Sequence, residues 1–452
     1  MKRTHEIDMT SGPLLKQILL FALPLIASSV LQLLFNAADV IVVGKFAGSL
    51  ALAAVGSNTS LIMLIVNLFI GISTGANVLV SRYFGSREQN QLTKCVHSSI
   101  GLSAILGILV CILGFFISEP ILHLMNVDPE VLPLAALYLK IYFLGTPATL
   151  VYNFGAAILR AVGDTERPLR FLTISGIVNV VLNLVLVIVF HMSVAGVAIA
   201  TAVSQYVAAF LVVRCLMRTD GDYRLHLSDL RLNGKMVLQL LIVGLPAGLQ
   251  SSVFSISNVL IQSSINSFGY VTMAANSAAS NIDGFVYVSI NAIHYAALSF
   301  TAQNYGARKF DRIKKIFINC FSVVTVIGIL VGTIAYLFGP QLLSLYISAS
   351  DPDRDAIIAT GMIRLKIICL TYCLCGLMDT ASGALRGLGK AWSPMIISAL
   401  GACVFRIVWI YTIFVAFRSL DMLYLSYPIS WIITTVALGI DLFFTFRKRH
   451  TI

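Results

Sequence analysis

The residue with the clearest chemistry in this chain is Asp39, a carboxylate inside an otherwise apolar stretch. Residues 18–43 read ILLFALPLIASSVLQLLFNAADVIVV, and Asp39 is the only charged residue among them. A carboxylate is costly to place in hydrocarbon, so such residues usually face a water-filled cavity or an ion pathway. The stretch is long enough to cross a bilayer. Asp39 is therefore predicted to be an ion-coupling group in a membrane transporter.

Other side chains that could support catalysis or metal binding are scattered. The 7 histidines form no HExxH-like set, and the 8 cysteines show neither metal-ligand spacing nor a disulfide framework. A channel would need a repeated filter sequence or a ring of charges, and neither is visible. The sequence thus predicts a protein that is not an enzyme and that carries no cofactor and no structural metal.

The amino-acid composition indicates that Asp39 is held within a membrane protein. Hydrophobic residues make up 58% of the 452 residues and charged residues only 11%, whereas soluble domains carry roughly 25% charged residues. Lipid must therefore be the solvent for most of the apolar surface. A net charge of +11 would suggest nucleic acid as a partner of a soluble protein. Here the basic residues are explained by membrane orientation, and no nucleic-acid partner is expected.

Twelve apolar segments are each long enough to span a hydrocarbon layer of about 30 Å. They predict an all-α polytopic membrane protein. The segments lie at residues 18–43, 50–80, 95–118, 130–158, 169–190, 193–217, 236–267, 271–302, 316–339, 357–384, 394–417 and 422–446.

Basic residues fix the predicted orientation. Of the 31 Lys and Arg residues, 24 lie in the two termini, including Lys2 and Arg3, and in alternate loops. The positive-inside rule then places both termini in the cytoplasm, which requires an even number of spans. We expect a multi-pass protein of the cell (inner) membrane.

The two halves of the chain repeat each other at an offset of about 220 residues. The matched pairs are Leu23-Pro24 with Leu245-Pro246, Phe35–Val40 with Phe254–Val259, Tyr83–Arg87 with Asn304–Arg308, and Leu159–Gly163 with Leu385–Gly389. Six spans per half give a parallel repeat, which implies two six-helix lobes related by a pseudo-twofold axis along the membrane normal. The predicted domains are an N-lobe (1–217), a cytoplasmic linker (218–234) and a C-lobe (235–452).

These motifs, in this order, resemble the multidrug and toxic compound extrusion (MATE) family. The resemblance rests on Pro24, Gln32 and Asp39 of the first span and on the repeated turn motifs, including Leu159–Asp164, Gln303–Ala307 and Leu385–Gly389. It implies a cation-coupled antiporter that exports organic, often cationic, small molecules by alternating access. It also implies a coupling site at Asp39, Asn179, Asn183 and Thr201, where either a proton or a sodium ion could bind.

Helix geometry supports part of this cluster. Asn179 and Asn183 are four residues apart and share one helix face. Counting about 1.5 Å per residue, they and Thr201 reach similar depths, and Asp39 lies in the outer half of its span. The family commonly has Asp where this chain has Asn183. One carboxylate is therefore missing, which favours a proton over sodium. Asparagine and threonine also often only bond neighbouring helices in membranes.

A second polar set is predicted in the C-lobe. Depth counting places Asp283 and Arg406 near the midplane, so the two are expected to pair, either as a buried ion pair or at the substrate. Gln32 and Asn153 are further candidates for lining the substrate cavity. Pro24 is expected to kink the first helix and act as a hinge.

One rival function comes from the same superfamily, namely a lipid-linked oligosaccharide flippase. Such relatives typically add spans or have a strongly basic central cavity. This chain has twelve predicted spans, and Arg406 is the one basic residue predicted at mid-depth, so efflux is favoured. The expected partners are small organic molecules, a proton or sodium ion and membrane lipid, and the chain is expected to act as a monomer.

Overall fold

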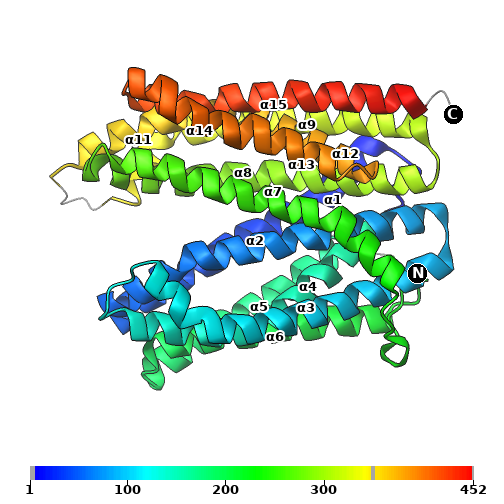
Figure 1. Cartoon of the computed structure of the whole chain (residues 1–452), viewed down its shortest axis with the longest axis horizontal. Coiled ribbons are helices and arrows are strands. Elements are labelled where there is room, and N and C mark those ends of the chain that lie inside the picture. Colours follow the sequence, from blue (N-terminus) through cyan, green and yellow to red (C-terminus); the bar gives the residue numbers. More distant parts are fainter. Residues whose placement is uncertain (1–5, 348–351, 450–452) are drawn as a thin grey trace. The chain divides into compact units, whose positions relative to one another are not determined.

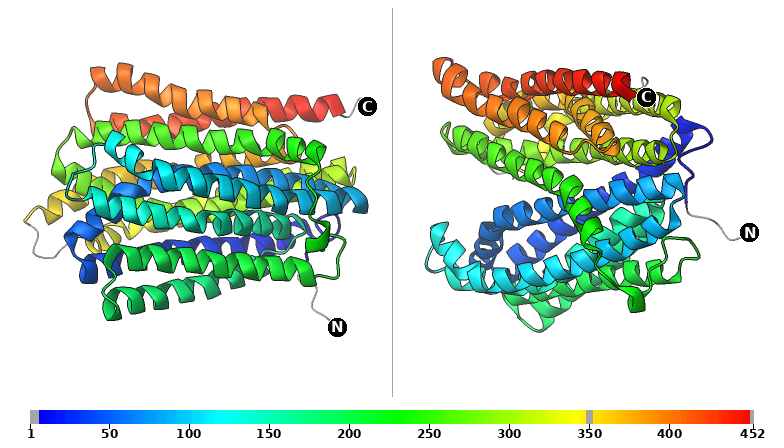
Figure 2. Two further views of the ribbon diagram at one scale, coloured as in Figure 1. Left: turned by 60° about the horizontal axis from the view of Figure 1, so that its bottom comes forward. Right: turned by 45° about the vertical axis from the view of Figure 1, so that its right-hand side comes forward.

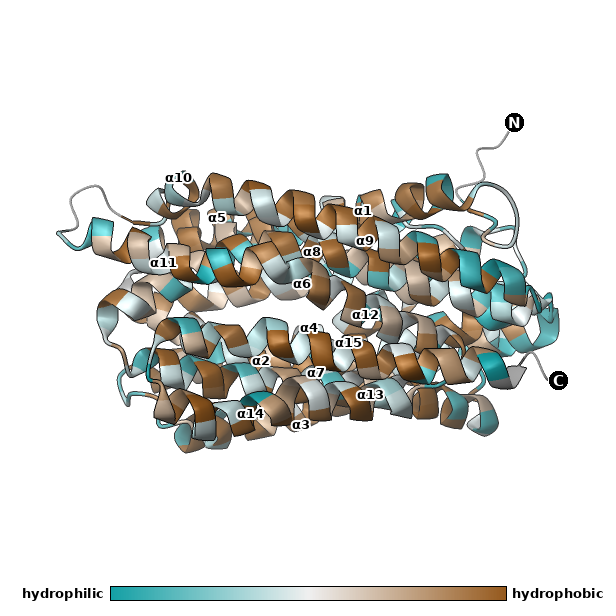
Figure 3. Cartoon of the chain, turned by 90° about the horizontal axis from the view of Figure 1, so that it is seen from above, coloured by the Kyte–Doolittle hydropathy of each residue, from teal (hydrophilic) through white to brown (hydrophobic). Residues whose placement is uncertain are grey.

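The computed structural model describes residues 6–347 and 352–449, and these ranges are almost entirely helical. Within them, twelve helical segments are long and apolar enough to cross a membrane, which confirms the predicted number of spans. Hydrophobic residues cover the middle of the helices and hydrophilic residues gather at their ends (Figure 3). Lys2 and Arg3, two of the predicted cytoplasmic basic residues, lie outside the described ranges.

Contacts divide the chain into two compact units. Unit 1 contains residues 6–8 and Leu23–Gly248, and its helices α3 to α6 lie side by side (Figure 1, Figure 2). The helices that begin in the first half of the chain are α1 (Leu14–Val42), η1 (Val43–Ala47), α2 (Ser49–Ser86), α3 (Gln89–Leu124), α4 (Leu132–Ala161), α5 (Glu166–Leu184), η2 (Val185–Val189), α6 (Ser193–Arg218), η3 (Leu227–Asp229) and α7 (Gly234–Asn266).

Unit 2 contains Met9–Ala22 and the chain from Leu249 onward. Two spans of the chain that lie in this unit are built from several pieces. The tenth consists of α11, η4 and α12, and the eleventh of α13, η5, α14 and η6. The helices that begin in the second half are α8 (Tyr270–Gly306), α9 (Phe310–Leu337), α10 (Gly339–Ser344), α11 (Arg354–Ile368), η4 (Cys369–Thr371), α12 (Tyr372–Gly387), α13 (Trp392–Ser398), η5 (Ala399–Val404), α14 (Phe405–Trp409), η6 (Ile410–Phe414) and α15 (Leu420–Arg449).

Two repeat-related helices each divide between the units next to a proline. Helix α1 belongs to unit 2 up to Ala22 and to unit 1 from Leu23 onward, directly before Pro24. Helix α7 belongs to unit 1 up to Gly248 and to unit 2 beyond it, two residues after Pro246. Proline removes a helical hydrogen bond and bends a helix. These positions are therefore the natural bending points of the two helices that the units share.

Within unit 1, small residues let α2 and the first part of α7 approach closely. Gly71 and Gly75 on α2 face Gly244 and Gly248 on α7, so both helices present glycines four residues apart. A Cβ at Gly71 would lie 2.3 Å from the Cα of Gly248, and a Cβ at Gly244 would lie 2.2 Å from a backbone oxygen of α2. Small residues at this spacing are typical of tight helix pairs in membranes.

We expect Gly71→Ala to destabilise unit 1 by about 1–3 kcal/mol, because the added methyl group would force two backbones apart. The measurement is the thermal unfolding midpoint of the purified protein in detergent. Gly56→Ala is the matched control on the same helix, since a Cβ at Gly56 meets no atom within 4 Å. Equal midpoints for the two variants would contradict this packing argument.

Candidate functional site

Close packing of α1 against α5 positions Asp39. Gly176 on α5 leaves room for the ring of Phe35 on α1, and a Cβ at Gly176 would lie 1.9 Å from the Cε2 atom of that ring. Asp39 follows Phe35 by four residues, and Asn183 follows Gly176 by seven, so each polar residue lies one or two turns beyond this contact on the same helix face. The aromatic–glycine contact thus sets the distance between Asp39 and α5.

The four predicted site residues form one hydrogen-bonded chain across three helices. Asn183 Nδ2 donates to Asp39 Oδ1 at 2.5 Å and lies 3.3 Å from Asn179 Oδ1. Asn179 Nδ2 in turn donates to Thr201 Oγ1 of α6 at 3.4 Å. The structure therefore brings together Asp39, Asn179, Asn183 and Thr201, as both the resemblance and the depth argument predicted. The side chains that join Asp39 to α6 are all neutral.

The four side chains of this hydrogen-bonded chain differ in burial. Asn179 and Asn183 are 5% and 1% exposed, whereas Asp39 and Thr201 are half-buried. Asn183 Oδ1 is buried and has no hydrogen-bond partner among the described residues. A buried acceptor without a partner is costly. A proton donor or a bound cation beside Asp39 is the kind of group that would satisfy it.

Helix α1, which carries Asp39, and helix α5, which bonds it through Asn183, both change from α-helical to π-helical winding immediately beyond the site. The π-helical turn η1 begins four residues after Asp39, and η2 begins two residues after Asn183. The two turns contact each other, and both contact α6. Single π-turns within α-helices occur frequently at functional sites. This irregular winding lies next to the only carboxylate in the hydrogen-bonded chain.

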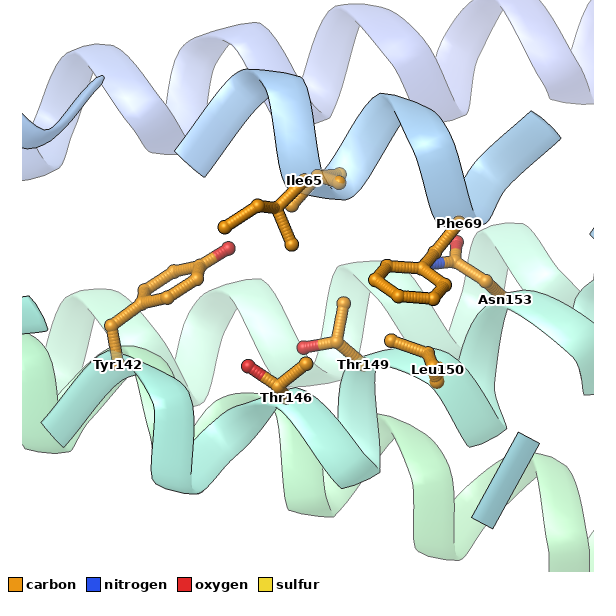
Figure 4. Close-up of a pocket in the computed structure, with 8 residues that line it drawn as sticks. Ile65, Phe69, Tyr142, Thr146, Thr149, Leu150 and Asn153 are labelled. Atoms are coloured by element: carbon orange, nitrogen blue, oxygen red, sulfur yellow. The ribbon is translucent and has the colours of Figure 1, made fainter. Parts of the chain in front are cut away.

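A small pocket lies between α2 and α4 of the same unit (Figure 4). Its walls include Asn153, Tyr142, Thr146 and Thr149 of α4 and Phe69 of α2. The room that it leaves for a water molecule is about 10 Å³, and the Thr146 hydroxyl is buried without a partner among the described residues. Asn153 thus faces a partly polar pocket, as expected of a cavity-lining residue. Gln32 is exposed on α1.

The predicted pairing of Asp283 with Arg406 is wrong. Asp283 Oδ2 instead accepts hydrogen bonds from Arg364 of α11, from Nη2 at 2.6 Å and from Nε at 2.9 Å. Arg364 Nη1 also donates to Asn276 Oδ1 at 2.6 Å, and the Tyr424 hydroxyl donates to the same oxygen at 3.1 Å. This buried network joins α8, α11 and α15 of unit 2.

Arg406 has a different environment on α14. Its Nε donates to Ser430 Oγ at 2.9 Å, and its guanidinium carbon lies 4.1 Å from the ring centroid of Tyr427 and 5.8 Å from that of Trp431. Arg406 is 2% exposed, and no carboxylate pairs with it among the described residues. Stacking on aromatic rings therefore takes the place of the expected ion pair. The substrate-cavity role of Gln32, Asn153, Asp283 and Arg406 stays a prediction.

Arg364 is the residue that sequence reasoning missed. It is one of the few basic residues outside the termini and the alternate loops, and it lies 10 residues into α11, within an apolar segment. Such a position is itself a signal, since a charge inside a span requires a partner. Within the described ranges, no cluster of three or more His, Cys, Asp or Glu side chains could hold a metal ion.

Comparison with known proteins identifies the family. A family model described as MatE matches residues 24–185 and 246–412, that is, once in each half of the chain. "Probable multidrug resistance protein YpnP" of Bacillus subtilis is 27% identical over 403 residues, covering 88% of each chain. A "FAD transporter" of Shewanella oneidensis is 24% identical over 409 residues, covering 88% of this chain and 87% of that protein.

Solved structures agree with the fold. The structure titled "Crystal structure of MATE in complex with MaL6" superposes with a TM-score of 0.89 at 24% identity, and the match covers 99% of this chain and 98% of the other. At that identity the likeness shows the fold alone, whereas the sequence model covers both halves. The chain therefore belongs to the MatE family of multidrug efflux transporters, as the resemblance of its motifs predicted.

Proposed function

We propose that this chain is a proton-coupled antiporter that exports organic, cationic small molecules. The observation that carries the proposal is the hydrogen-bonded chain from Asp39 through Asn183 and Asn179 to Thr201, in which Asp39 alone can ionise. Burial favours the neutral form of a carboxyl group, and a nearby cation favours the charged form. A carboxyl group in this setting can therefore exchange a proton for an organic cation.

The composition of this site supports a proton more than sodium. Sodium is a hard cation that prefers several oxygen ligands, with charged carboxylates among the best. Asn183 provides an amide where the family commonly has a second acid, so Asp39 is the single anionic ligand available here. Amide and hydroxyl groups can bond either protonation state of Asp39. The site can therefore keep hydrogen bonds to Asp39 in both its protonated and its ionised form.

Coupling follows from competition at Asp39. An organic cation is attracted to the ionised carboxylate and is released when the carboxylate takes up a proton. Binding of one cation then excludes the other, as antiport requires, and by linkage each lowers the affinity for the other equally. Gln32, which is exposed on α1, and Asn153, which lines the pocket, are proposed to contact the organic molecule.

Alternating access is proposed to use Pro24 as a hinge. Pro24 lies directly beyond the point at which α1 passes from unit 2 to unit 1, and Asp39 lies on the unit 1 part of the same helix. A change of charge at Asp39 would alter the packing of this part against α5. The proposed orientation has both termini and the linker 218–234 in the cytoplasm, with lobes 1–217 and 235–452, in a protein that acts as a monomer.

The test is whether substrate binding releases a proton. Purified protein in weakly buffered detergent solution is titrated with tetraphenylphosphonium, and the proton release is followed with a pH indicator. We expect release of about one proton per bound cation when Asp39 starts protonated. Asp39→Asn should release none, and Glu130→Gln, which changes an exposed acid, should behave like the parent protein. Binding without proton release in the parent protein would contradict the proposal.

A further inference from the structure

An open basic pocket lies where α8 turns into α9 in unit 2. Four basic residues and a single acidic one line it, and its volume is about 510 Å³. Together with Phe310, the lining residues are Arg308, Lys309, Asp311, Arg312 and Lys315. The turn belongs to the set of loops that the distribution of basic residues assigns to the cytoplasmic side. It therefore lies at the level of the lipid headgroups.

The internal repeat provides a matched turn for comparison, between α2 and α3 of unit 1. Arg87 and Arg308 are 221 residues apart, and both have positive φ, 59° and 56°. The amide of Arg87 donates to Phe84 and that of Glu88 to Tyr83, and the two equivalent bonds recur at Arg308 and Lys309. The two turns thus have the same backbone and differ in their side chains.

In unit 1 the linker that follows α6 lies against part of this surface, while Arg87 and Lys94 stay exposed. Gln89 Nε2 donates to Asp222 Oδ2 at 3.1 Å, and Thr93 Oγ1 donates to the carbonyl oxygen of Asp222 at 3.1 Å. One turn further along α3, His97 is buried, and its Nε2 accepts the backbone N–H of His226 at 3.0 Å. The linker therefore places the carboxylate of Asp222 beside the unit 1 turn and covers His97.

In unit 2 the position equivalent to His97 is open. Ile318 takes the place of His97 and is 63% exposed, and Arg308, Lys314 and Lys315 are exposed as well. Lys309 Nζ donates to the carbonyl oxygen of Thr10 at 2.8 Å. A carbonyl oxygen satisfies the hydrogen bond of this ammonium group but does not neutralise its charge. With four basic residues and one acidic residue, the pocket has an excess of positive charge, whereas the unit 1 turn carries Glu88 and contacts Asp222.

Below the basic residues, α9 presents an apolar row to the surroundings. Ile318, Val326 and Ile329 share roughly one helix face and are 63%, 63% and 51% exposed. Lys314 and Lys315 precede Ile318 by four and three residues, so they lie on the same side of the helix. A basic group directly above an exposed apolar row matches a molecule with an anionic head and a hydrocarbon tail.

We propose that this pocket binds the phosphate headgroup of an anionic phospholipid, with the acyl chain along Ile318, Val326 and Ile329. Arg308 and Lys315 contact the phosphate from opposite ends of the turn, and Lys314 adds charge at its edge. A soluble phosphate would use the same cationic groups but would leave the apolar row unused. Because the apolar row continues directly from the pocket, we favour a lipid over a soluble phosphate as the ligand.

The test compares matched pairs of substitutions in the two repeat-related turns. Purified full-length protein in neutral detergent is titrated with phosphatidylglycerol or phosphatidylcholine, and bound lipid is measured by native mass spectrometry. We expect Arg308→Gln/Lys315→Gln to weaken phosphatidylglycerol binding on the order of tenfold to thirtyfold, as for the loss of two surface cations. Arg87→Gln/Lys94→Gln removes the same charge from exposed positions of the unit 1 turn. This turn also carries Glu88 and contacts Asp222, so the change in binding should be less than about twofold.

Three results would overturn this assignment. The first is equal weakening by the two double variants, which would reflect general charge attraction. The second is phosphatidylcholine binding as tightly as phosphatidylglycerol. The third is displacement of the lipid by inorganic phosphate, which would assign the pocket to a soluble anion. Should the double variant in unit 2 fail to fold, Lys315→Gln against Lys94→Gln gives the same comparison with one charge. None of these readouts depends on Asp39 or on transport.

Discussion

Asp39→Asn is expected to yield a protein that folds and inserts but has lost gradient-driven export. Asparagine has nearly the shape of aspartate and can still accept the hydrogen bond of Asn183 Nδ2. It cannot ionise, so it neither attracts an organic cation nor carries a proton. Export of a fluorescent cation, measured in vesicles that contain the purified variant, should fall to the level of protein-free vesicles.

A graded control is available at the other end of the hydrogen-bonded chain. Thr201→Val removes the hydroxyl group that contacts Asn179 and leaves the carboxyl group of Asp39 in place. Its export should be slower than that of the parent protein but still driven by the gradient, since the lost contact is worth about 1 kcal/mol. If Thr201→Val were inactive and Asp39→Asn active, the roles assigned to these two residues would be wrong.

The second large effect is expected in unit 2, at the Arg364–Asp283 pair. Removing one member of a buried ion pair leaves the other charge without compensation and costs about 3–5 kcal/mol. We therefore expect Arg364→Met to lower the thermal unfolding midpoint sharply. It leaves the buried carboxylate of Asp283 without its charged partner and removes a hydrogen-bond donor from Asn276. Lys366→Met, an exposed position on the same helix, should leave the midpoint nearly unchanged.

A double substitution separates this pair from the one predicted by sequence. Asp283→Asn/Arg364→Met removes both charges and should recover part of the stability lost in Arg364→Met. Asp283→Asn/Arg406→Met should be no more stable than the worse of its single variants, because Arg406 bonds Ser430 and stacks on Tyr427 instead. Recovery in the Arg406 combination alone would contradict the observed network.

That the four candidate residues lie together could be predicted in part, because helix geometry fixes some of their positions. Asn179 and Asn183 share a helix face by their spacing, and counting residues from each end gives their depth and that of Thr201. Asp39 stood out as the only charge in the first apolar stretch, and the motif resemblance supplied the set of four residues. The close packing of Phe35 against Gly176, which holds α1 against α5, has no comparable sequence signal.

The partner of Asp283 could not be predicted by the same counting. Residue number gives depth along a span but not which neighbouring helix a side chain faces. Asp283 and Arg406 are at similar depths, yet α8 contacts α11 and α12, whereas Arg406 on α14 contacts α15. The π-turns beyond Asp39 and Asn183 were also invisible, because a uniformly apolar segment does not reveal where its winding changes.

Export from vesicles under separately imposed gradients tests the central claim most directly. Vesicles containing the parent protein or Asp39→Asn are loaded with a fluorescent organic cation. Either a proton gradient at constant sodium or a sodium gradient at constant pH is then applied. The account predicts export by the parent protein under the proton gradient only, and no export by Asp39→Asn under either. Export driven by the sodium gradient at constant pH, or normal proton-driven export by Asp39→Asn, would contradict it.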